Sequence, residues 1–306
     1  MQTLYGVEPA YPKNTEDFSD KRVLTSIQNQ AKKQFQEQLD QTAELFAYFA
    51  YIVCQVALYA EKDAKLRSEK YLKTEEDLNV SVKIAGNLIV WDILENPNFI
   101  ALRKSHAWEE KLDTDYIRLL YKIFIETPEY KEYIKSEERS LQSDKAIFKF
   151  LWTEVLLEHE DFNNYLSEDW NNWDDDYELN LILLDNLLKR SKVFNFQQIV
   201  SVDKLDFSFE LLETVISKQE YLTKVLLPKL KNWDPDRLAM IDMILLKMGI
   251  SEFLYFDTIP TKVTINEYIE IGKQYSTAQS GQFINGVLDN ILKDLESNQS
   301  IYKIKH

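Results

Sequence analysis

The segment WDPDRLAMIDMILLKMGISEFLYF, residues 233–256, decides the fold class of this chain. Asp234 is a favourable N-cap residue, and Pro235 suits the first helical position, where its missing N–H costs no hydrogen bond. The apolar residues that follow recur at spacings of three to five, which predicts a helix with a broad apolar face that extends to about Leu254. These residues are Leu238, Ile241, Leu245, Met248 and Phe253. We expect the first four to be buried in a helical bundle.

Two further helices are predicted after this segment. Residues 257–260 form a break that ends in a proline, and Thr264 to Glu267 resemble a helix start. Gly272 lies on the apolar stripe of the first of these helices, where the absence of a side chain permits close helix approach. Residues 276–281 are predicted to form a polar turn, and the last helix is predicted to begin at Gln282.

The chain on the N-terminal side of this segment is also predicted to be helical. Residues 20–73 contain no Pro or Gly, which favours one or two long helices. Within them, residues 45–60 (LFAYFAYIVCQVALYA) are apolar but shorter than the ~20 residues of a membrane-spanning helix. We therefore expect a central buried helix and no membrane association. Capping residues and stop signals predict further helices at 80–95, 114–126, 144–158 and 176–190.

Composition supports an all-α fold in two parts. The 306 residues include only 6 Gly and 7 Pro, too few for glycine-rich phosphate loops or many tight hairpins. Apolar periodicity weakens over 193–208, just after the basic run Lys189–Lys192, which predicts a linker. We expect a helical N-terminal region over 1–200, a compact helical domain over 205–296 and a tail over 297–306.

Charge is divided unevenly between the two parts. The chain carries a net −15, and residues 205–306 hold 14 acidic against 11 basic side chains. That part is at −3, so the remaining −12 lies on residues 1–204. A balance this negative argues against attraction of the whole protein to nucleic acid or to an anionic membrane. Any contact with a polyanion is expected to be local and to involve the C-terminal part.

The chemistry-bearing residues do not form a recognisable catalytic or metal-binding pattern. Cys54 is the single cysteine, and the three histidines stand far apart. His159 lies among acidic residues, which we interpret as a solvated helix end rather than a metal site. The sequence contains no evident nucleophile and base pair or phosphate loop, and its start lacks the features of a signal peptide. We expect a cytoplasmic protein that is not an enzyme and has no cofactor or metal.

Three motifs together resemble a known family. They are Trp233…Arg237, PTKVTINEYIE at 260–270 and FINGVLD at 283–289. In this combination they resemble the transcription antitermination factor NusB over about residues 207–295. Gln2 to Tyr5 resemble the middle of the family's first helix. The region between is similar to the acidic N-terminal half of an extended form.

The resemblance implies an all-α helical bundle of NusB type with an enlarged helical N-terminal region. It also implies a non-catalytic transcription antitermination factor. Members of the family pair with NusE, a small-subunit ribosomal protein. Together they hold the boxA element of nascent single-stranded RNA in the RNA polymerase antitermination complex. The alternative is a helical adaptor that binds the ribosomal protein but little RNA.

The resemblance also implies positions for two binding surfaces. Carried onto this sequence, the RNA-binding residues are Gln2, Gln279, Ser280, Gln282 and Phe283, and the partner-binding residues are Tyr5 and Asp242. Phe283 can stack a splayed base or be a core residue, and the sequence leaves both open. A charge reversal at Asp242 is expected to weaken the complex. The family's arginine-rich arm precedes its first helix. That arm is absent here, since only Met1 stands before Gln2. Either the reading frame begins upstream of Met1, or this chain is expected to attract RNA phosphates weakly.

Overall fold

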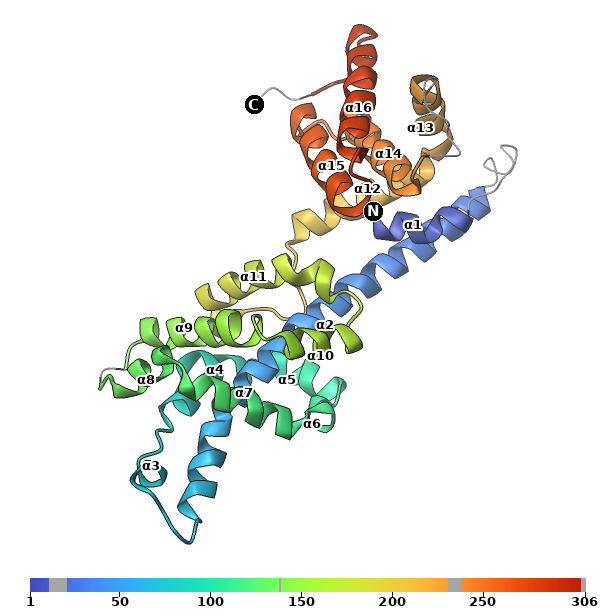
Figure 1. The fold of residues 1–306 in the computed structure, drawn as a ribbon. Helices are drawn as coiled ribbons and strands as arrows, with labels where there is room; N and C mark the ends of the chain where they lie inside the picture. Colours follow the sequence, from blue (N-terminus) through green and yellow to red (C-terminus); the bar gives the residue numbers. More distant parts are fainter. Residues whose placement is uncertain (11–20, 138, 231–237, 304–306) are drawn as a thin grey trace. The chain divides into compact units, whose positions relative to one another are not determined.

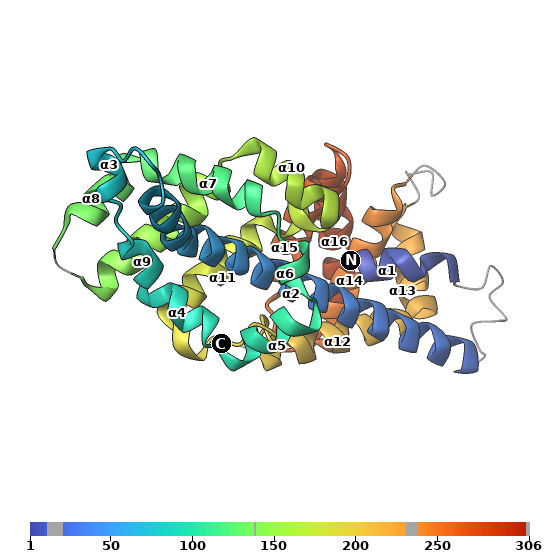
Figure 2. The ribbon, with the colours of Figure 1, turned by 90° about the horizontal axis from the view of Figure 1, so that it is seen from below.

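The computed structural model describes residues 1–10, 21–137, 139–230 and 238–303. These residues form helices and no strand, so the predicted all-α fold is confirmed for the described ranges. The chain divides into two compact units. Unit 1 comprises residues 1–38 and 200–306, and unit 2 comprises residues 39–199 (Figures 1 and 2).

Unit 2 is built around the greater part of one long helix, α2 (Lys21–Ser68). The helices that follow are α3 (Glu75–Leu78), α4 (Leu88–Leu94), α5 (Pro97–Ser105), α6 (Trp108–Lys111), α7 (Thr114–Glu126), α8 (Pro128–Lys135), α9 (Leu141–Phe150), α10 (Glu160–Asp169) and α11 (Trp173–Lys189). Two 3₁₀ turns, η3 (Lys83–Gly86) and η5 (Ser191–Val193), precede α4 and follow α11. The π-helical stretch η4 (Leu151–Leu156) continues α9.

Local capping sets many of these boundaries. The Asn87 side chain caps α4, and Asn96, followed by a proline at the first helical position, caps α5. Asp113 caps α7, whose bounds agree with the predicted 114–126. Each cap supplies an acceptor to N–H groups that the first helical turn leaves unpaired. The helices α5, α8 and α10 were not predicted from the sequence.

The apolar stretch of α2 forms the core of unit 2. Nearly every residue from Leu45 to Ala60 is buried, including Cys54. Phe49 illustrates the packing, since its ring centroid lies 4.5 Å from that of Trp152 and 5.2 Å from that of Phe162. By length and composition α2 could cross a membrane, but 83% of its most apolar window is buried inside the structure. The predicted central buried helix is therefore confirmed.

A buried carboxylate joins α4 to α9. Asp144 is fully buried, and its side chain accepts hydrogen bonds from the Leu88 backbone N–H (2.9 Å) and the Tyr133 hydroxyl (2.6 Å). The amide of Asn87 donates to the Asp144 carbonyl (2.9 Å). These bonds satisfy groups that would otherwise be buried without partners, and they fix the two helix starts against each other.

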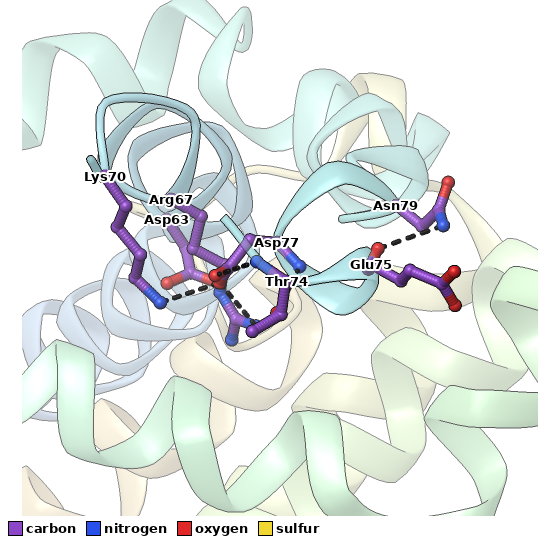
Figure 3. A network of polar contacts seen from close by, with 7 residues as sticks. All are labelled: Asp63, Arg67, Lys70, Thr74, Glu75, Asp77 and Asn79. Carbon is purple, nitrogen blue, oxygen red and sulfur yellow. Dashed lines mark hydrogen bonds and ion pairs between the residues drawn. The ribbon is translucent and has the colours of Figure 1, made fainter. Parts of the chain in front are cut away.

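A second carboxylate organises the segment after α2 (Figure 3). Asp77 accepts hydrogen bonds from the Lys70 ammonium (2.6 Å) and the Thr74 backbone N–H (3.1 Å). The Thr74 hydroxyl in turn accepts from the Asp77 N–H (3.2 Å). The hydrogen bond from Lys70 is the main cause that lowers the pKa of Asp77 to about 2. Tyr71, within this segment, is 99% exposed.

Unit 1 combines the start of the chain with its C-terminal helices. Its helices besides the first part of α2 are α1 (Gln2–Val7), α12 (Val202–Ser217), α13 (Gln219–Leu226), α14 (Met240–Tyr255), α15 (Thr261–Tyr275) and α16 (Ser280–Ser297), with 3₁₀ turns η1 (Glu8–Ala10) and η6 (Leu227–Leu230). A Cβ placed on Gly272 would collide with the Ile284 side chain. The glycine therefore permits the close approach of α15 and α16, as predicted.

The structure corrects several boundaries. Helix α14 begins at Met240, because Ala239 has extended backbone angles. The predicted helix start at Asp234 and Pro235 lies outside the described residues. Helix α12 begins inside the predicted 193–208 linker. The predicted N-terminal region of 1–200 is also divided, because residues 1–38 pack with the C-terminal helices.

The predicted burial of four residues on the apolar face of α14 holds in part. Leu245 is fully buried, whereas Leu238, Ile241 and Met248 are half-buried and pack against the same core. Helix α14 also buries Ile244, Leu246 and Ile250, which were not among the predicted core residues. The apolar face is therefore present but wider than the spacing predicted.

Asp144→Ala should lower the free energy of unfolding by about 2–4 kcal/mol, because it leaves the buried Tyr133 hydroxyl without its acceptor and removes the acceptor of the partly buried Leu88 N–H. Urea titration followed by circular dichroism measures this change. Gln142→Ala, at an exposed position of the same helix, is the control and should have little effect. Equal stability of the two variants would contradict the structural role of Asp144.

Asp77→Ala should expose the segment 69–82 to proteases at neutral pH while global unfolding changes little. Because the folded pKa of Asp77 is lowered to about 2, its contribution is complete above the unfolded pKa and is lost as the pH falls through the folded value. Limited proteolysis with mass spectrometry measures the opening, and Glu75→Ala is the control. An unchanged cleavage rate would mean that Asp77 does not hold this segment.

Candidate functional site

The seven predicted binding residues all lie in unit 1, on three helices. Gln2 and Tyr5 are on α1, and Asp242 is in the first turn of α14. The other four, Gln279, Ser280, Gln282 and Phe283, lie at the start of α16. The structure brings the starts of α14 and α16 into direct contact, and α1 packs against α14 (Figures 1 and 2).

Helix α1 is held on unit 1 by one apolar face and two polar contacts. Leu4 and Val7 are buried in the core that α14 and α16 share. The Thr3 hydroxyl donates to the Gln38 side chain (2.7 Å), and the Lys247 ammonium of α14 lies 3.4 Å from the Glu8 carboxylate. Tyr5 points to the opposite side and is 49% exposed. This residue is therefore available to a partner, as its predicted role requires.

Asp242 and Ser280 form a buried pair. Asp242 is only 4% exposed, and its Oδ2 accepts a hydrogen bond from the Ser280 hydroxyl (2.9 Å). Ser280 is also buried, and its oxygen accepts from the Thr277 backbone N–H (3.1 Å). Neither side chain is therefore presented on an exposed surface of this structure, and their binding roles stay predictions. Both side chains instead fix the α15–α16 turn onto the start of α14.

Phe283 is buried as well. Its side chain is 6% exposed and belongs to the apolar core of unit 1, together with Ile284 and Val287 on the same helix. A ring in this position cannot stack on a splayed base without leaving the core. Of the two roles that the sequence left open, the structure supports the core role.

Amide side chains remain exposed at the turn that the buried pair fixes. Gln279 precedes α16 and Gln282 lies in its first turn, and both are exposed, as is Gln2 on α1. Each amide offers a donor and an acceptor, the groups that read base edges in single-stranded RNA. Lys273 supplies a cation at the same turn. Its aliphatic stem packs against Gly281, where an added Cβ would lie 3.0 Å from the Lys273 Cγ. Lys273 also forms an exposed ion pair with Glu270 (2.7 Å).

A second buried carboxylate, which was not predicted from the sequence, lies at the other end of α14. Glu252 accepts hydrogen bonds from the Thr264 hydroxyl (2.7 Å) and the Tyr268 hydroxyl (2.5 Å) of α15. Burial raises the pKa of Glu252. The Lys303 ammonium donates to the carbonyls of Glu252 and Phe256 at the end of this helix. A threonine and a tyrosine spaced four residues apart on α15 were the available signal, but only the fold places them opposite Glu252.

These buried carboxylates serve packing rather than metal binding. Among the residues that the structure describes, no group of three His, Cys, Asp or Glu side chains is placed to hold a metal ion. Cys54 is buried, and burial raises its pKa far above the usual range of a thiol. His159 caps α10, where its Nδ1 accepts from the Phe162 N–H (3.3 Å). The candidate site is therefore the exposed surface around Gln279 and Gln282, with Tyr5 on the adjoining α1.

Ser280→Ala should lower the free energy of unfolding by about 1–3 kcal/mol, because it removes the hydroxyl that donates a hydrogen bond to the buried Asp242 carboxylate. Asp242→Ala should cost a similar amount, and the double variant should cost less than the sum of the two single variants. Urea denaturation of the four proteins measures the coupling, with Gln282→Ala as an exposed control. Additive losses would show that the two side chains do not form a pair.

Comparison with known proteins places this arrangement in a family. Residues 177–293 match the model of the NusB family. Proteins named transcription antitermination protein NusB are 40% identical over 111 residues in Methylacidiphilum infernorum and 38% identical over 114 residues in Listeria monocytogenes. These alignments cover 36% and 37% of this chain, and 76% and 83% of the relatives.

A third relative of the same name, from Chloroherpeton thalassium, is 36% identical over 105 residues, which cover 34% of this chain and half of the relative. No solved structure matches the chain. The matched family region contains α12 to α15 and most of α16, and so includes both the Asp242–Ser280 pair and the exposed glutamines. With this similarity to most of the length of two relatives, the chain belongs to the NusB family.

Proposed function

We propose that this protein is a cytoplasmic, non-catalytic transcription antitermination factor. In this proposal it binds boxA-type single-stranded RNA together with a NusE-type small-subunit ribosomal protein, within the RNA polymerase antitermination complex. The single observation that supports the role most strongly is the match of residues 177–293 to the NusB family, since the relatives carry the name transcription antitermination protein. The exposed side chains of unit 1 indicate which residues are available to contact RNA and which to contact the ribosomal protein.

The RNA contact is proposed at the turn between α15 and α16. Gln279 and Gln282 are exposed there, and Lys273 provides a cation on the preceding helix. Gln2 is proposed as an additional contact because it is exposed on α1. Amides recognise base edges, whereas the lysine neutralises a phosphate. Asp242 and Ser280 do not contact RNA in this proposal; their hydrogen bond holds the turn in place. Phe283 anchors the start of α16 in the apolar core.

The ribosomal-protein contact is proposed on α1. Tyr5 exposes half of its surface on a helix that is anchored to α14. Tyrosine is enriched among residues that dominate binding energy, because it combines a large apolar ring with a hydroxyl. Asp242 is not proposed as a direct contact, since its carboxylate is buried. Its effect on partner binding would act through the position of the α15–α16 turn.

One observation favours the alternative role of an adaptor with little RNA binding of its own. Residues 205–306 carry a net charge of −3, and Lys293, like Lys273, already forms an ion pair with a neighbouring acid. Affinity for RNA depends mainly on phosphates that cations neutralise. Such a surface binds RNA weakly alone and gains affinity when a partner contributes further cations.

Gln279→Ala combined with Gln282→Ala should weaken boxA-type RNA binding about threefold to tenfold without changing its salt dependence, because amides contact bases. Lys273→Gln should instead reduce the slope of log K against log salt by about 0.7, the value for one phosphate on single-stranded RNA. Fluorescence anisotropy at several salt concentrations, with and without the ribosomal protein, measures both effects.

Lys293→Gln is the matched control for this experiment, because it removes a paired lysine elsewhere on α16. If neither the double glutamine variant nor Lys273→Gln weakens RNA binding, the proposed RNA surface is rejected. Binding that is detectable only in the presence of the ribosomal protein would favour the adaptor role.

Tyr5→Ala should weaken binding of the NusE-type ribosomal protein by about 1–2 kcal/mol, which is roughly fivefold to thirtyfold. Isothermal titration calorimetry measures this change. Tyr302→Ala removes a tyrosine that is 81% exposed near the C-terminus and serves as the control. Unchanged affinity of a folded Tyr5→Ala variant would place the ribosomal protein on another surface.

A further inference from the structure

Unit 2 contains a groove that the proposed function does not use. It lies among α4, α9 and the turn η5 after α11, and its volume is about 420 Å³. Its lining includes the aliphatic side chains of Leu88, Leu141 and Val193 and the cations Lys145, Arg190 and Lys192. A neighbouring hollow of about 310 Å³ shares Lys145 with it. The basic run noted in the sequence at 189–192 therefore forms one wall of this groove.

The cations of the groove stand out in a strongly acidic region. Residues 1–204 carry a net −12, yet Lys145, Arg190 and Lys192 form no ion pair with any residue of the described ranges. Nearby, Lys149 is paired with Asp185 (2.8 Å). Three unpaired cations around one groove produce a local positive potential, which attracts anionic groups of a ligand.

The same groove exposes aliphatic surface. Leu88 and Leu141 are 45% and 47% exposed, and Val193 is 77% exposed. Scattered exposed apolar residues need no explanation, but three that line a single groove offer a continuous surface that gains free energy when a ligand covers it. The groove therefore offers two kinds of recognition, apolar contact and positive charge.

Polar ties hold the groove walls in place. The Asp144 carboxylate accepts from the Leu88 N–H and so fixes the start of α4 to α9. The Ser191 hydroxyl donates to the Asp92 carboxylate (2.6 Å) and fixes η5 to α4. Leu88 and Asp92 lie four residues apart on α4, as Leu141 and Lys145 do on α9, so each pair shares one helix face. Because the groove walls are already fixed, less conformational entropy of the protein is lost when a ligand binds.

We propose that this groove binds an acidic segment of a partner protein that also carries aliphatic side chains. Carboxylates of the segment pair with Lys145, Arg190 and Lys192, and its aliphatic side chains cover Leu88, Leu141 and Val193. RNA fits less well, because it has no aliphatic groups to cover Leu88, Leu141 and Val193. The groove also lacks an aromatic side chain in its lining on which a base could stack.

The test uses the full chain and labelled twelve-residue probes in fluorescence anisotropy. The first probe is a peptide with four Leu-Glu-Glu repeats. The second replaces Leu with Ser, the third replaces Glu with Gln, and the fourth is a single-stranded oligouridylate of similar length. We expect the first peptide to bind, and the other three probes to bind at least about tenfold more weakly, because each lacks one of the two kinds of contact.

Matched variants locate the binding. Lys145→Glu with Arg190→Glu should weaken the first peptide about tenfold or more, and Val193→Ser should weaken it severalfold. Lys104→Glu with Lys111→Glu makes the same charge change at exposed positions of unit 2 outside the lining, and Ile182→Ser is the apolar control. Neither control should change the affinity. Circular dichroism verifies that every variant is folded.

Three outcomes overturn the proposal. They are no binding of the first peptide at millimolar concentration, equal effects of the groove variants and their controls, and tighter binding of the oligouridylate that the groove variants abolish. The last outcome would assign the groove to nucleic acid. The groove variants should not change the binding of boxA-type RNA or of the ribosomal protein by unit 1. The groove proposal and the proposed function can therefore be tested independently of each other.

Discussion

The structure depends first on the apolar stretch of α2 between Leu45 and Ala60. A helix that is apolar on every side must be covered on every side, because each exposed large side chain would forfeit roughly 1.5–3 kcal/mol of burial free energy. Unit 2 meets this requirement with short helices that surround the stretch and contribute Trp152 and Phe162 to its aromatic contacts. Apart from Asp77 and Asp144, the acidic residues of unit 2 whose side chains are described are at least partly exposed, which explains how a unit with so much negative charge can still be compact.

Buried carboxylates then fix how the helices meet. Asp144 in unit 2, and Asp242 and Glu252 in unit 1, each accept hydrogen bonds from another helix or its first turn. A buried acceptor that loses its donor is costly, so each such bond selects one arrangement of two helices over its neighbours. In unit 1 one of these hydrogen bonds bears on the proposed RNA surface. The Asp242–Ser280 pair holds the turn that presents Gln279 and Gln282, so an acid that touches no ligand can still determine whether a ligand binds.

The two units offer surfaces of different character. The candidate RNA surface of unit 1 consists of amides with one paired lysine, and it suits specific but weak contacts that a partner strengthens. The groove of unit 2 combines unpaired cations with aliphatic side chains, and it suits a protein segment. If this chain acts within an assembly, as the proposed function holds, the groove of unit 2 would give it a further attachment there.

The sequence by itself determined the helical fold, the bounds of α7 and the burial of the α2 core, because capping and apolar periodicity are local properties of the chain. It also carried the motifs that identify the family. Only the tertiary structure decided the environment of Asp242 and Phe283. The resemblance assigned Asp242 to a partner surface, and for Phe283 the sequence left a stacking role and a core role open. The first turns of α14 and α16 are 38 residues apart in the sequence, and no local pattern records that Ser280 covers Asp242. The groove of unit 2 has the same origin, since Lys145 and Arg190 come together only when α9 packs beside the end of α11.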